Sequence, residues 1–378
     1  MKEKRGSPLP IPSLQIPIGE KFIGSAATAK PLDAKHVYTP AAFNMHQDGG
    51  NTGTTDYPGP LGKNLEPTTA LESLHIMMWT RSGQQNLWFS SGGLRAQGGH
   101  GDAQQNTSTF GYIEPDGTVY VQHFENQMVE NGTAINGTTV FAVTGPSGDA
   151  SGANAQGYFY VFGPGEGNSI TTLWSIPCDA GDVQKLGSYA RGSGATPALL
   201  GDQYVAITDN AMGQVNLVIY HQEKQTDGPQ TVCKVPIFQP GKSNIDIAPL
   251  AHHQGGTYGV FLCNDYNAPP LYYVDSGLNG DFNNLTQMEP GIIKINSVPV
   301  LSTKSGLVYG YTQAVELTKY GQYTWYVVAV DWETGKEVWR LRTGTGGTFN
   351  DDYQPGAIGP DGSFYQGVIG GVQKDHGK

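Results

Sequence analysis

A pattern of apolar and turn-forming residues returns four times along the second half of the chain. Each copy begins with a proline and a few apolar residues, passes through a turn that contains Gly, and continues into a β-branched and aromatic run. The copies are ATPALLGDQYVAITDN, APLAHHQGGTYGVFLCND, VPVLSTKSGLVYGYTQ and QPGAIGPDGSFYQGVIG. Such runs on both sides of a short turn predict pairs of antiparallel strands, and a strand can begin at a proline.

The interval between the copies predicts the architecture. Pro197, Pro249, Pro299 and Pro355 are 52, 50 and 56 residues apart. This interval is longer than that of helical repeats and fits one four-stranded sheet per unit, which is the spacing of β-propeller blades. The second half of a unit is clearest in TWYVVAVDWETGKEVWRLRTG. This half resembles the repeat of quinoprotein-type propellers, in which a strand ending in Asp is followed by Thr-Gly-Lys and a Trp.

Two weaker copies extend the pattern toward the N-terminus, FGYIEPDGTVYVQHFEN from Phe110 and HIMMWTRSGQQNLWFSSG from His75. They bring the count to six units, with five or seven as alternatives because residues 145–193 diverge too far to be counted. The last unit, from Pro355, has room for two strands. We expect the stretch Val37–Phe43 to supply the rest, because pairing of the two chain ends would close the ring and leave no open sheet edge.

The chain is therefore predicted to be all-β, with an extended, proline-rich segment over residues 1–30 and a single propeller domain over 31–378. Its composition agrees, since 53 Gly and 24 Pro imply many turns and 15% charged residues leave little for exposed helices. No apolar stretch reaches membrane-spanning length. The net charge of −11 argues against nucleic acid and anionic membranes as partners, so small molecules are expected, and a homodimer stays open.

Four glycosylation sequons, at Asn106, Asn131, Asn136 and Asn284, favour the secretory pathway. The opening residues Met1–Pro17 lack the apolar core of a signal peptide, so a cytoplasmic location is the alternative.

The three cysteines exclude a complete disulfide framework because their number is odd. Cys263 lies in an apolar run and is expected to be buried. A Cys178–Cys233 bridge is open.

Common catalytic motifs are missing: there is no Gly-x-Ser-x-Gly, no His-Glu-x-x-His, no phosphate loop and no EF-hand loop. Quinoprotein dehydrogenases carry adjacent cysteines under their cofactor, which this chain lacks, so we predict neither that cofactor nor a metal. Ligands of propellers bind where the loops converge around the axis. Four polar places are candidates: His46, Asp48 and Asp56; Lys185, Tyr189 and Arg191; Asp209 and Asn210 with Asn264, Asp265 and Tyr266; and Asp351, Asp352 and Tyr353.

Each candidate has a structural alternative. An Asp or Asn after a strand often caps its own turn, which applies to Asp209, Asn210, Asp351 and Asp352. Arg191 stands among Gly and Ser beside an inner strand, where it is placed to meet an anionic ligand.

The succession ATPALLGDQYVAITDN, VCKVPIF and CNDYN, with the opening loop NMHQDGGNTGTTDYPGPLG, resembles a group of bacterial and fungal propellers from about His36 onward. Some similar fungal members are hetero-Diels–Alderases that make tropolone–sesquiterpene meroterpenoids. The resemblance implies a cofactor-free cyclase, which joins an ortho-quinone methide, formed by dehydration of a tropolone precursor, to a humulene-type sesquiterpene. Its substrates would be apolar and phenolic.

The cyclase would use the candidate residues in defined roles. Arg191 or Lys185 would hold the acidic enol, His46 or Asp48 would act as the acid, and Tyr266 or Tyr353 would donate a hydrogen bond to the quinone oxygen. The other expected substrate contacts are Tyr189, Asn210, Asn264, Asp265 and Asp352.

Two other functions stay open. A calcium-dependent propeller lactonase or hydrolase would take its oxygen ligands from Asp48, Asp209, Asn210, Asn264 and Asp265. A propeller that binds a ligand without catalysis needs none of these roles.

Overall fold

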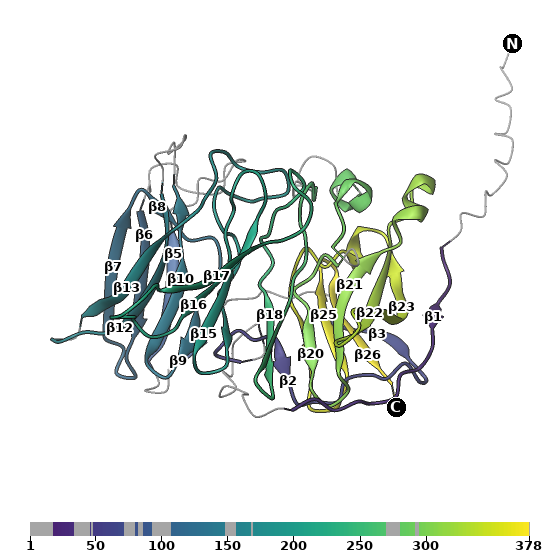
Figure 1. Ribbon diagram of the computed structural model, residues 1–378. Coiled ribbons are helices and arrows are strands. Elements are labelled where there is room, and N and C mark those ends of the chain that lie inside the picture. Colours follow the sequence, from purple (N-terminus) through teal and green to yellow (C-terminus); the bar gives the residue numbers. More distant parts are fainter. Residues whose placement is uncertain are drawn as a thin grey trace, which may run out of the picture.

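The computed structural model describes residues 18–33, 46, 48–71, 80–81, 86–92, 107–147, 156–167, 169–269, 280–291 and 295–377. Almost all regular structure in these ranges is β (Figure 1). The exceptions are four short 3-10 turns, η1 (Asp281–Asn283), η2 (Leu285–Gln287), η3 (Val315–Tyr320) and η4 (Gly347–Phe349). The prediction of an all-β chain is confirmed.

One sheet shows how a repeat unit folds. It contains β14 (Ala198–Leu200), β15 (Tyr204–Thr208), β16 (Asn216–His221) and β17 (Thr231–Pro236), hydrogen-bonded in that order. Every neighbouring pair is antiparallel. Sheet order therefore equals chain order, as in the four-stranded blade of a propeller.

The other sheets repeat this order. They are β4 (Thr80–Arg81), β5 (Leu87–Gly92), β6 (Thr107–Ile113) and β7 (Val119–Glu125); β9 (Ala134–Asn136), β10 (Thr139–Val143), β12 (Gly157–Pro164) and β13 (Ile170–Cys178); β18 (Leu250–Gln254) and β19 (Thr257–Phe261); and β20 (Val300–Ser302), β21 (Leu307–Gln313), β22 (Thr324–Asp331) and β23 (Glu337–Thr345). A small ladder joins β8 (Gln127–Met128) to β11 (Gly145–Pro146). First strands of neighbouring sheets lie side by side, β4 by β9 and β14 by β18.

The repeated prolines mark the first strands. Pro197, Pro249 and Pro299 each directly precede a first strand, namely β14, β18 and β20, and Pro355 precedes β24 (Gly356–Ile358). The proline-initiated strand pairs predicted from the sequence are confirmed at all four places.

The earlier units were assigned wrongly. The phrase from Phe110 forms β6 and β7, the third and fourth strands of the same sheet that holds the phrase from His75. The diverged region, residues 145–193, instead holds β12 and β13 of a separate sheet, whose other two strands are β9 and β10. It escaped the repeat pattern because Thr133, not a proline, precedes its first strand.

The two ends of the chain meet in one sheet. The last unit supplies three strands rather than the predicted two: β24, β25 (Phe364–Val368) and β26 (Gly371–His376). The fourth is β3 (Glu66–Leu71), antiparallel to β26. The expected donor Val37–Phe43 lies outside the described residues. Within the segment expected to be extended, β1 (Phe22–Gly24) adds an outer strand to β23.

Residues 49–55 run along the first strands of four consecutive sheets. Backbone N–H groups of these strands donate to successive carbonyls of the segment: Ile135 to Gly49 (2.7 Å), Leu199 to Gly50 (2.9 Å), Ala251 to Thr52 (2.9 Å) and Leu301 to Gly53 (2.8 Å). The segment ends as β2 (Thr54–Thr55), parallel to β20. It therefore satisfies N–H groups at the inner edges of four sheets, which would otherwise lack strand partners.

The composition of this segment fits its position. Asn51 has a left-handed backbone (φ 52°), and its Nδ2 donates to the carbonyls of Thr133 (2.7 Å) and Pro197 (3.2 Å). Gly53 is also left-handed (φ 66°), and a Cβ there would stand 3.2 Å from the Pro299 carbonyl oxygen. Glycine and asparagine are the residues that adopt this conformation most readily.

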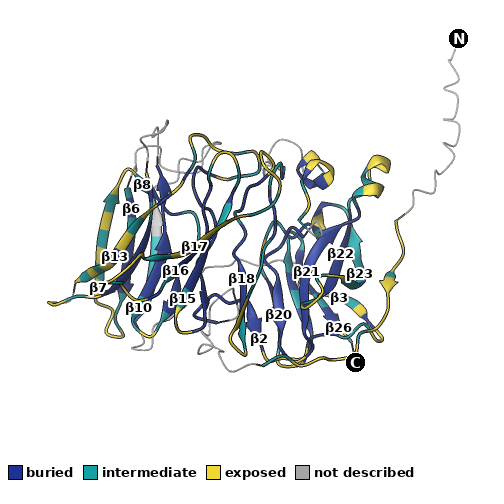
Figure 2. Ribbon diagram, in the orientation of Figure 1, coloured by how far each residue is buried: buried dark blue, intermediate teal, exposed yellow. Residues whose placement is uncertain are grey.

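Aromatic residues fill the space between neighbouring sheets. Trp325, Trp339, Tyr309 and Phe364 pack between the sheet of β20–β23 and that of β24–β26. Phe159 and Trp174 stack between the sheets of β12 and β15. Outer strands such as β7 and β13 alternate between exposed and covered residues (Figure 2).

All three cysteines are free. Cys263 is buried as predicted, and Cys178 and Cys233 do not form a disulfide bridge. Cys178 is buried on β13, whereas Cys233 is exposed on the outer strand β17.

A substitution of Asn51 tests the role of residues 49–55, which we call the central segment. Asn51→Ala leaves two carbonyls, those of Thr133 and Pro197, without their amide donor, so we expect a loss of about 1–3 kcal/mol in the free energy of unfolding. The measurement is urea unfolding. Gln225→Ala, which removes an amide from an exposed turn, should change stability little. Equal effects of the two substitutions would contradict the structural role of Asn51.

Asp375 on β26 predicts a pH dependence of stability. Its carboxyl is buried without a hydrogen-bond partner, and burial raises its pKa to about 8. The folded state therefore holds this proton more tightly than the unfolded state, whose Asp pKa is about 4. Stability should fall by up to roughly 1.4 kcal/mol per pH unit between these values, and Asp375→Asn should remove that slope.

Unfolding free energies of wild type and variant between pH 4 and 9 measure this difference. Asp361→Asn is the matched control, since bonding to Lys374 lowers the pKa of Asp361 and its contribution has the opposite sign. Parallel pH curves for wild type and Asp375→Asn would rule out the buried ionisation.

Candidate functional site

Three of the four predicted places lie on loops at one end of the sheets, the end at which the first strands begin. They are the segment 185–191, the loops after β15 and β19, and the segment 351–353. In Figure 1 the first two of these loop regions lie above the strands to which they connect. The side chains nevertheless fall into separate groups with different partners.

His46 and Asp48 lie directly before the central segment and bond to it. Both are buried, and the Asp48 carboxylate accepts hydrogen bonds from the backbone N–H (3.1 Å) and the hydroxyl of Thr52. Burial raises the pKa of Asp48 to about 7 and lowers that of His46 to about 4. Asp56 is exposed just beyond this segment.

A second group ties the loops to one another. Arg191 Nε donates to the Gly181 carbonyl at 2.8 Å, and Lys185 Nζ donates to the Ala211 and Ser243 carbonyls at 2.5 and 3.2 Å. Burial lowers the pKa of Lys185 to about 8. Both cationic groups thus bond to backbone.

The Asp and Asn residues after β15 and β19 bond both within their own turns and to other segments of the chain. Asn210 Nδ2 donates to the Gly192 carbonyl (2.7 Å), and Asp209 accepts from Asn216 and pairs with Lys234 at 2.7 Å. Asn264 Oδ1 accepts from the backbone N–H groups of Asn244 (3.2 Å) and Tyr266 (3.1 Å). The contacts of Asn264 with Tyr266 match the turn-forming alternative, whereas those with Gly192, Lys234 and Asn244 join separate segments.

The third group consists of Tyr189, Asp352 and Tyr353. The rings of Tyr189 and Tyr353 meet edge to face, with centroids 6.5 Å apart. Tyr189 is 47% exposed, yet burial, followed by the charge of Asp352, raises the pKa of its hydroxyl. Burial also raises the pKa of Asp352 to about 6.

Asp352 and Tyr353 have left-handed backbones, with φ of 55° and 59°. Such a conformation costs a non-glycine residue roughly 1–3 kcal/mol. Two hydrogen bonds hold it: Asp352 N–H donates to Asn350 Oδ1 and Gln354 N–H donates to the Asp351 carbonyl, both at 3.0 Å. Backbone strain of this kind is typical of functional loops.

Buried carboxyl groups lie behind Tyr189. The Tyr189 N–H donates to Asp246 Oδ2 (3.0 Å), and Asp265 Oδ2 accepts from the Asp246 N–H (2.7 Å). A Cβ at Gly194 would come within 2.5 Å of Asp246 Oδ1 and 3.0 Å of Glu130 Cδ, so these two acids flank the glycine. Both oxygens of Glu130, with Asp246 Oδ1 and Asp265 Oδ1, are buried without a hydrogen-bond partner.

The pKa values of these acids depend on one another. Burial raises the pKa of Asp246 to about 7. Burial, and then the charge of Asp246, raise the pKa values of Glu130 and Asp265 well above their usual range. The cluster therefore stays largely protonated near neutral pH, because several adjacent buried charges without donors are too costly.

The sequence predicted Tyr189, Asp265, Asp352 and Tyr353, and the structure brings them together. Glu130 and Asp246 were missed. A positional signal exists: the fourth residue before the first strands β9, β14, β18, β20 and β24 is Glu130, Gly194, Asp246, Asn296 and Asp352, respectively. Aligning the repeated prolines would have placed the last four in one equivalent position.

No three His, Cys, Asp or Glu side chains in the described ranges stand where they could hold a metal ion. The oxygen ligands predicted for calcium bond to separate neighbours, Asp48 to Thr52 and Asp209 to Lys234. In the same ranges no helix is long and apolar enough to cross a membrane.

Three sequons can be located. Asn131 Nδ2 donates to the carbonyls of Gly194 (2.8 Å) and Asp246 (3.3 Å), and Asn136 Nδ2 donates to Gln222. Asn284 Oδ1 accepts from Thr286. Asn106 lies outside the described residues, and glycosylation stays a prediction.

No protein-family model matches the chain. An uncharacterised protein of Archaeoglobus fulgidus is 24% identical over 243 residues, which cover 55% of this chain and 46% of that protein. The chain thus spans about half the length of this relative. TolB from Acinetobacter baumannii (9% identity, TM-score 0.30) matches 69% of this chain and 52% of its own. The WD40 domain of SCAP from fission yeast has 8% identity and a TM-score of 0.36, and the match covers 83% of this chain and 74% of the SCAP domain chain. At these scores neither structure bears on the fold or function.

Asp246→Asn tests the coupling within the acid cluster. The amide oxygen can still accept from the Tyr189 N–H, but the charge is gone, so the pKa values of Glu130 and Asp265 should both fall. Carboxyl ¹³C NMR titration measures these values. Asp227→Asn, in an exposed turn, is the control and should leave both unchanged; the same result for Asp246→Asn would show that the three acids do not interact.

Proposed function

We propose that the chain is a six-bladed propeller closed by the pairing of β3 with β26. Its sheets follow one another in chain order, and first strands of neighbouring sheets lie side by side, including β20 by β24. The meeting of N- and C-terminal segments in one sheet supports a closed ring, since closure removes open edges. Tyr189, Asp352 and Tyr353 would then line a recess on the face of the ring that carries the loops before the first strands.

We further propose that this recess binds a small organic molecule and catalyses an acid-assisted reaction on it. The observation that carries this proposal is the strained Asp352–Tyr353 pair opposite Tyr189. Asp352 is half-buried, and its pKa of about 6 suits a general acid at mildly acidic to neutral pH. The two tyrosines have raised pKa values and therefore remain hydrogen-bond donors.

The cyclase implied by the sequence resemblance is the specific form of this reaction that we propose. Asp352 would protonate the leaving hydroxyl of a hydroxymethyl tropolone, and its carboxylate would then take the proton of the ring enol. The net change is loss of one water, and the resulting quinone methide adds to an alkene without further exchange of atoms. Tyr353 would donate a hydrogen bond to the quinone oxygen.

The roles of other residues change accordingly. His46 and Asp48 were expected to act as the acid, but their contacts are with the central segment. Arg191 and Lys185 were expected to hold the enol, yet their cationic groups bond to carbonyls. Asp352 therefore takes the acid role in the proposal.

The test is to incubate the protein with a hydroxymethyl tropolone and humulene and to analyse the products by chiral chromatography. We expect one stereoisomer, formed faster than in buffer, with a rate that falls as pH rises through about 6 because the acid form of Asp352 is lost. Asp352→Asn should lower the rate roughly 10²-fold or more and remove this pH dependence.

Asp361→Asn, in a turn at the opposite end of β24 and β25, is the matched control and should keep full activity. Equal rates and product mixtures with and without protein would refute the cyclase. Binding without turnover would leave only a ligand-binding propeller, and activity that a chelator abolishes would favour the calcium-dependent hydrolase.

A further inference from the structure

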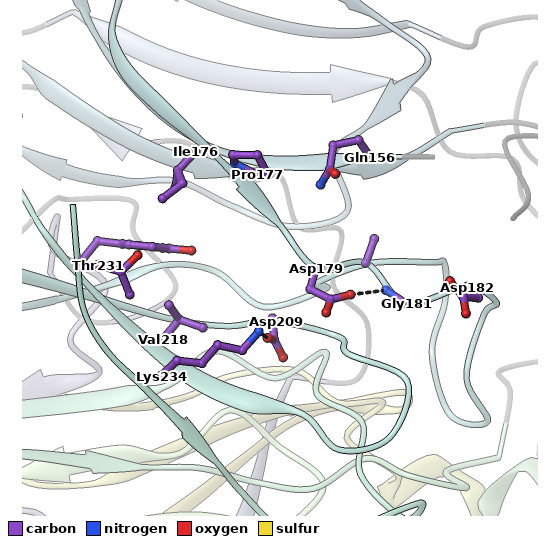
Figure 3. A pocket seen from close by; sticks show the side chains of 12 residues that line it. Gln156, Ile176, Pro177, Asp179, Gly181, Asp182, Asp209, Val218, Thr231 and Lys234 are labelled. Atoms are coloured by element: carbon purple, nitrogen blue, oxygen red, sulfur yellow. Dashed lines mark hydrogen bonds and ion pairs between the residues drawn. The ribbon is translucent and has the colours of Figure 1, made fainter. Parts of the chain in front are cut away.

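A second cavity lies between the sheets of β13 and β16–β17, apart from the recess. Its volume is about 330 Å³, and it is lined by residues from β13, the loop after β13, β16 and β17, with Gln156 before β12 and Asp209 after β15. Figure 3 shows Ile176, Val218 and Thr231 on one side, with Asp179 and Asp182 on the other. The cavity thus has an apolar end and an acidic end.

The charges of the lining are unbalanced. Lys234 Nζ lies 2.7 Å from Asp209 Oδ2, so these two groups neutralise each other. Asp179 Oδ1 accepts from the Gly181 N–H at 3.0 Å, a bond that leaves its charge in place. Asp182 is exposed and forms no hydrogen bond or ion pair with any other described residue. The lining therefore contains three Asp and one Lys, a net charge of −2, and Lys185 outside the lining also interacts with Asp179.

Tyr220 provides an independent indication of a ligand. Its side chain lines the cavity and is only 3% exposed. Its ring packs on Phe159 and Trp174, but within the described part of the chain its hydroxyl has no hydrogen-bond partner. A phenol that lines a cavity can bond to a molecule bound there.

We propose that this cavity binds a small primary amine that carries a short apolar chain. The ammonium group would lie at Asp179 and Asp182, and the chain would pack on Ile176 and Val218. The Tyr220 hydroxyl would accept a hydrogen bond from the ammonium. An anionic ligand would meet only the neutralised Lys234, and a volume of this size admits a small molecule.

The experiment is NMR titration of the full chain, following the methyl groups of Val218 and Ile176, with n-pentylamine, pentanoate and pentanol as probes. We expect saturable shifts with pentylamine, weaker ones with pentanol and none with pentanoate. Binding of the amine should weaken as salt rises, because the charges are partly exposed.

Variants separate binding from folding. Asp179→Asn combined with Asp182→Asn should weaken pentylamine binding at least fivefold, which corresponds to about 1 kcal/mol for a screened ion pair. The amide oxygen that this substitution places at position 179 can still accept from the Gly181 N–H. Tyr220→Phe keeps the shape of the core and should weaken binding severalfold. Asp227→Asn, in an exposed turn, is the control.

The outcomes decide between ligand classes. Saturable binding of pentanoate, or equal binding of all three probes, would overturn the assignment to amines. Unchanged pentylamine binding in the double variant, with the spectrum of the folded protein retained, would overturn the role of the acidic end. None of these outcomes depends on activity at Asp352.

Discussion

The hydrogen bonds between residues 49–55 and the first strands hold the centre of this structure together. In the proposed propeller the first strand of every sheet lies at the axis, where each has an inner edge without a strand partner. Here one short segment accepts a hydrogen bond from four of those edges in succession. Asn51 extends the same pattern, because its amide donates to the carbonyls of Thr133 and Pro197, the residues that directly precede two neighbouring first strands. The spacing of these sheets is thereby fixed by backbone geometry as well as by packing.

The recess is a consequence of this spacing. When first strands are held at fixed intervals, the residues just before them converge, and the fourth residue before each strand occupies an equivalent place. Gly194 leaves that place open, so that the carboxyls of Glu130 and Asp246 approach from both sides. Asp352 occupies the same position in the last sheet, where its strained loop keeps it partly exposed. The repeat therefore fixes where these residues lie, and the differences between its units place acidic side chains at some of these positions.

Much of the fold could be predicted because strand initiation and turns are local. Each repeated proline precedes a first strand, and the runs after it are strands. The unit count was less secure, since one sheet was counted twice and the sheet beginning at Ala134 was not counted. Four of the six site residues, Tyr189, Asp265, Asp352 and Tyr353, followed from polar residues next to strands. The role of His46 and Asp48 did not, because a Gly-rich polar loop looks the same whether it bonds to a ligand or to distant strands.

The buried acids are hard to explain as structural elements. Each carboxyl without a donor lowers stability once it ionises, and adjacent charges add to that cost. The fold does not require an acid at this position, since Asn296 occupies it before β20 and donates to Asp351 instead. Glycine also suffices, as Gly194 shows. Acids at residues 130, 246 and 352 therefore add a cost that neighbouring units avoid. This difference favours a chemical role for the recess over a packing role.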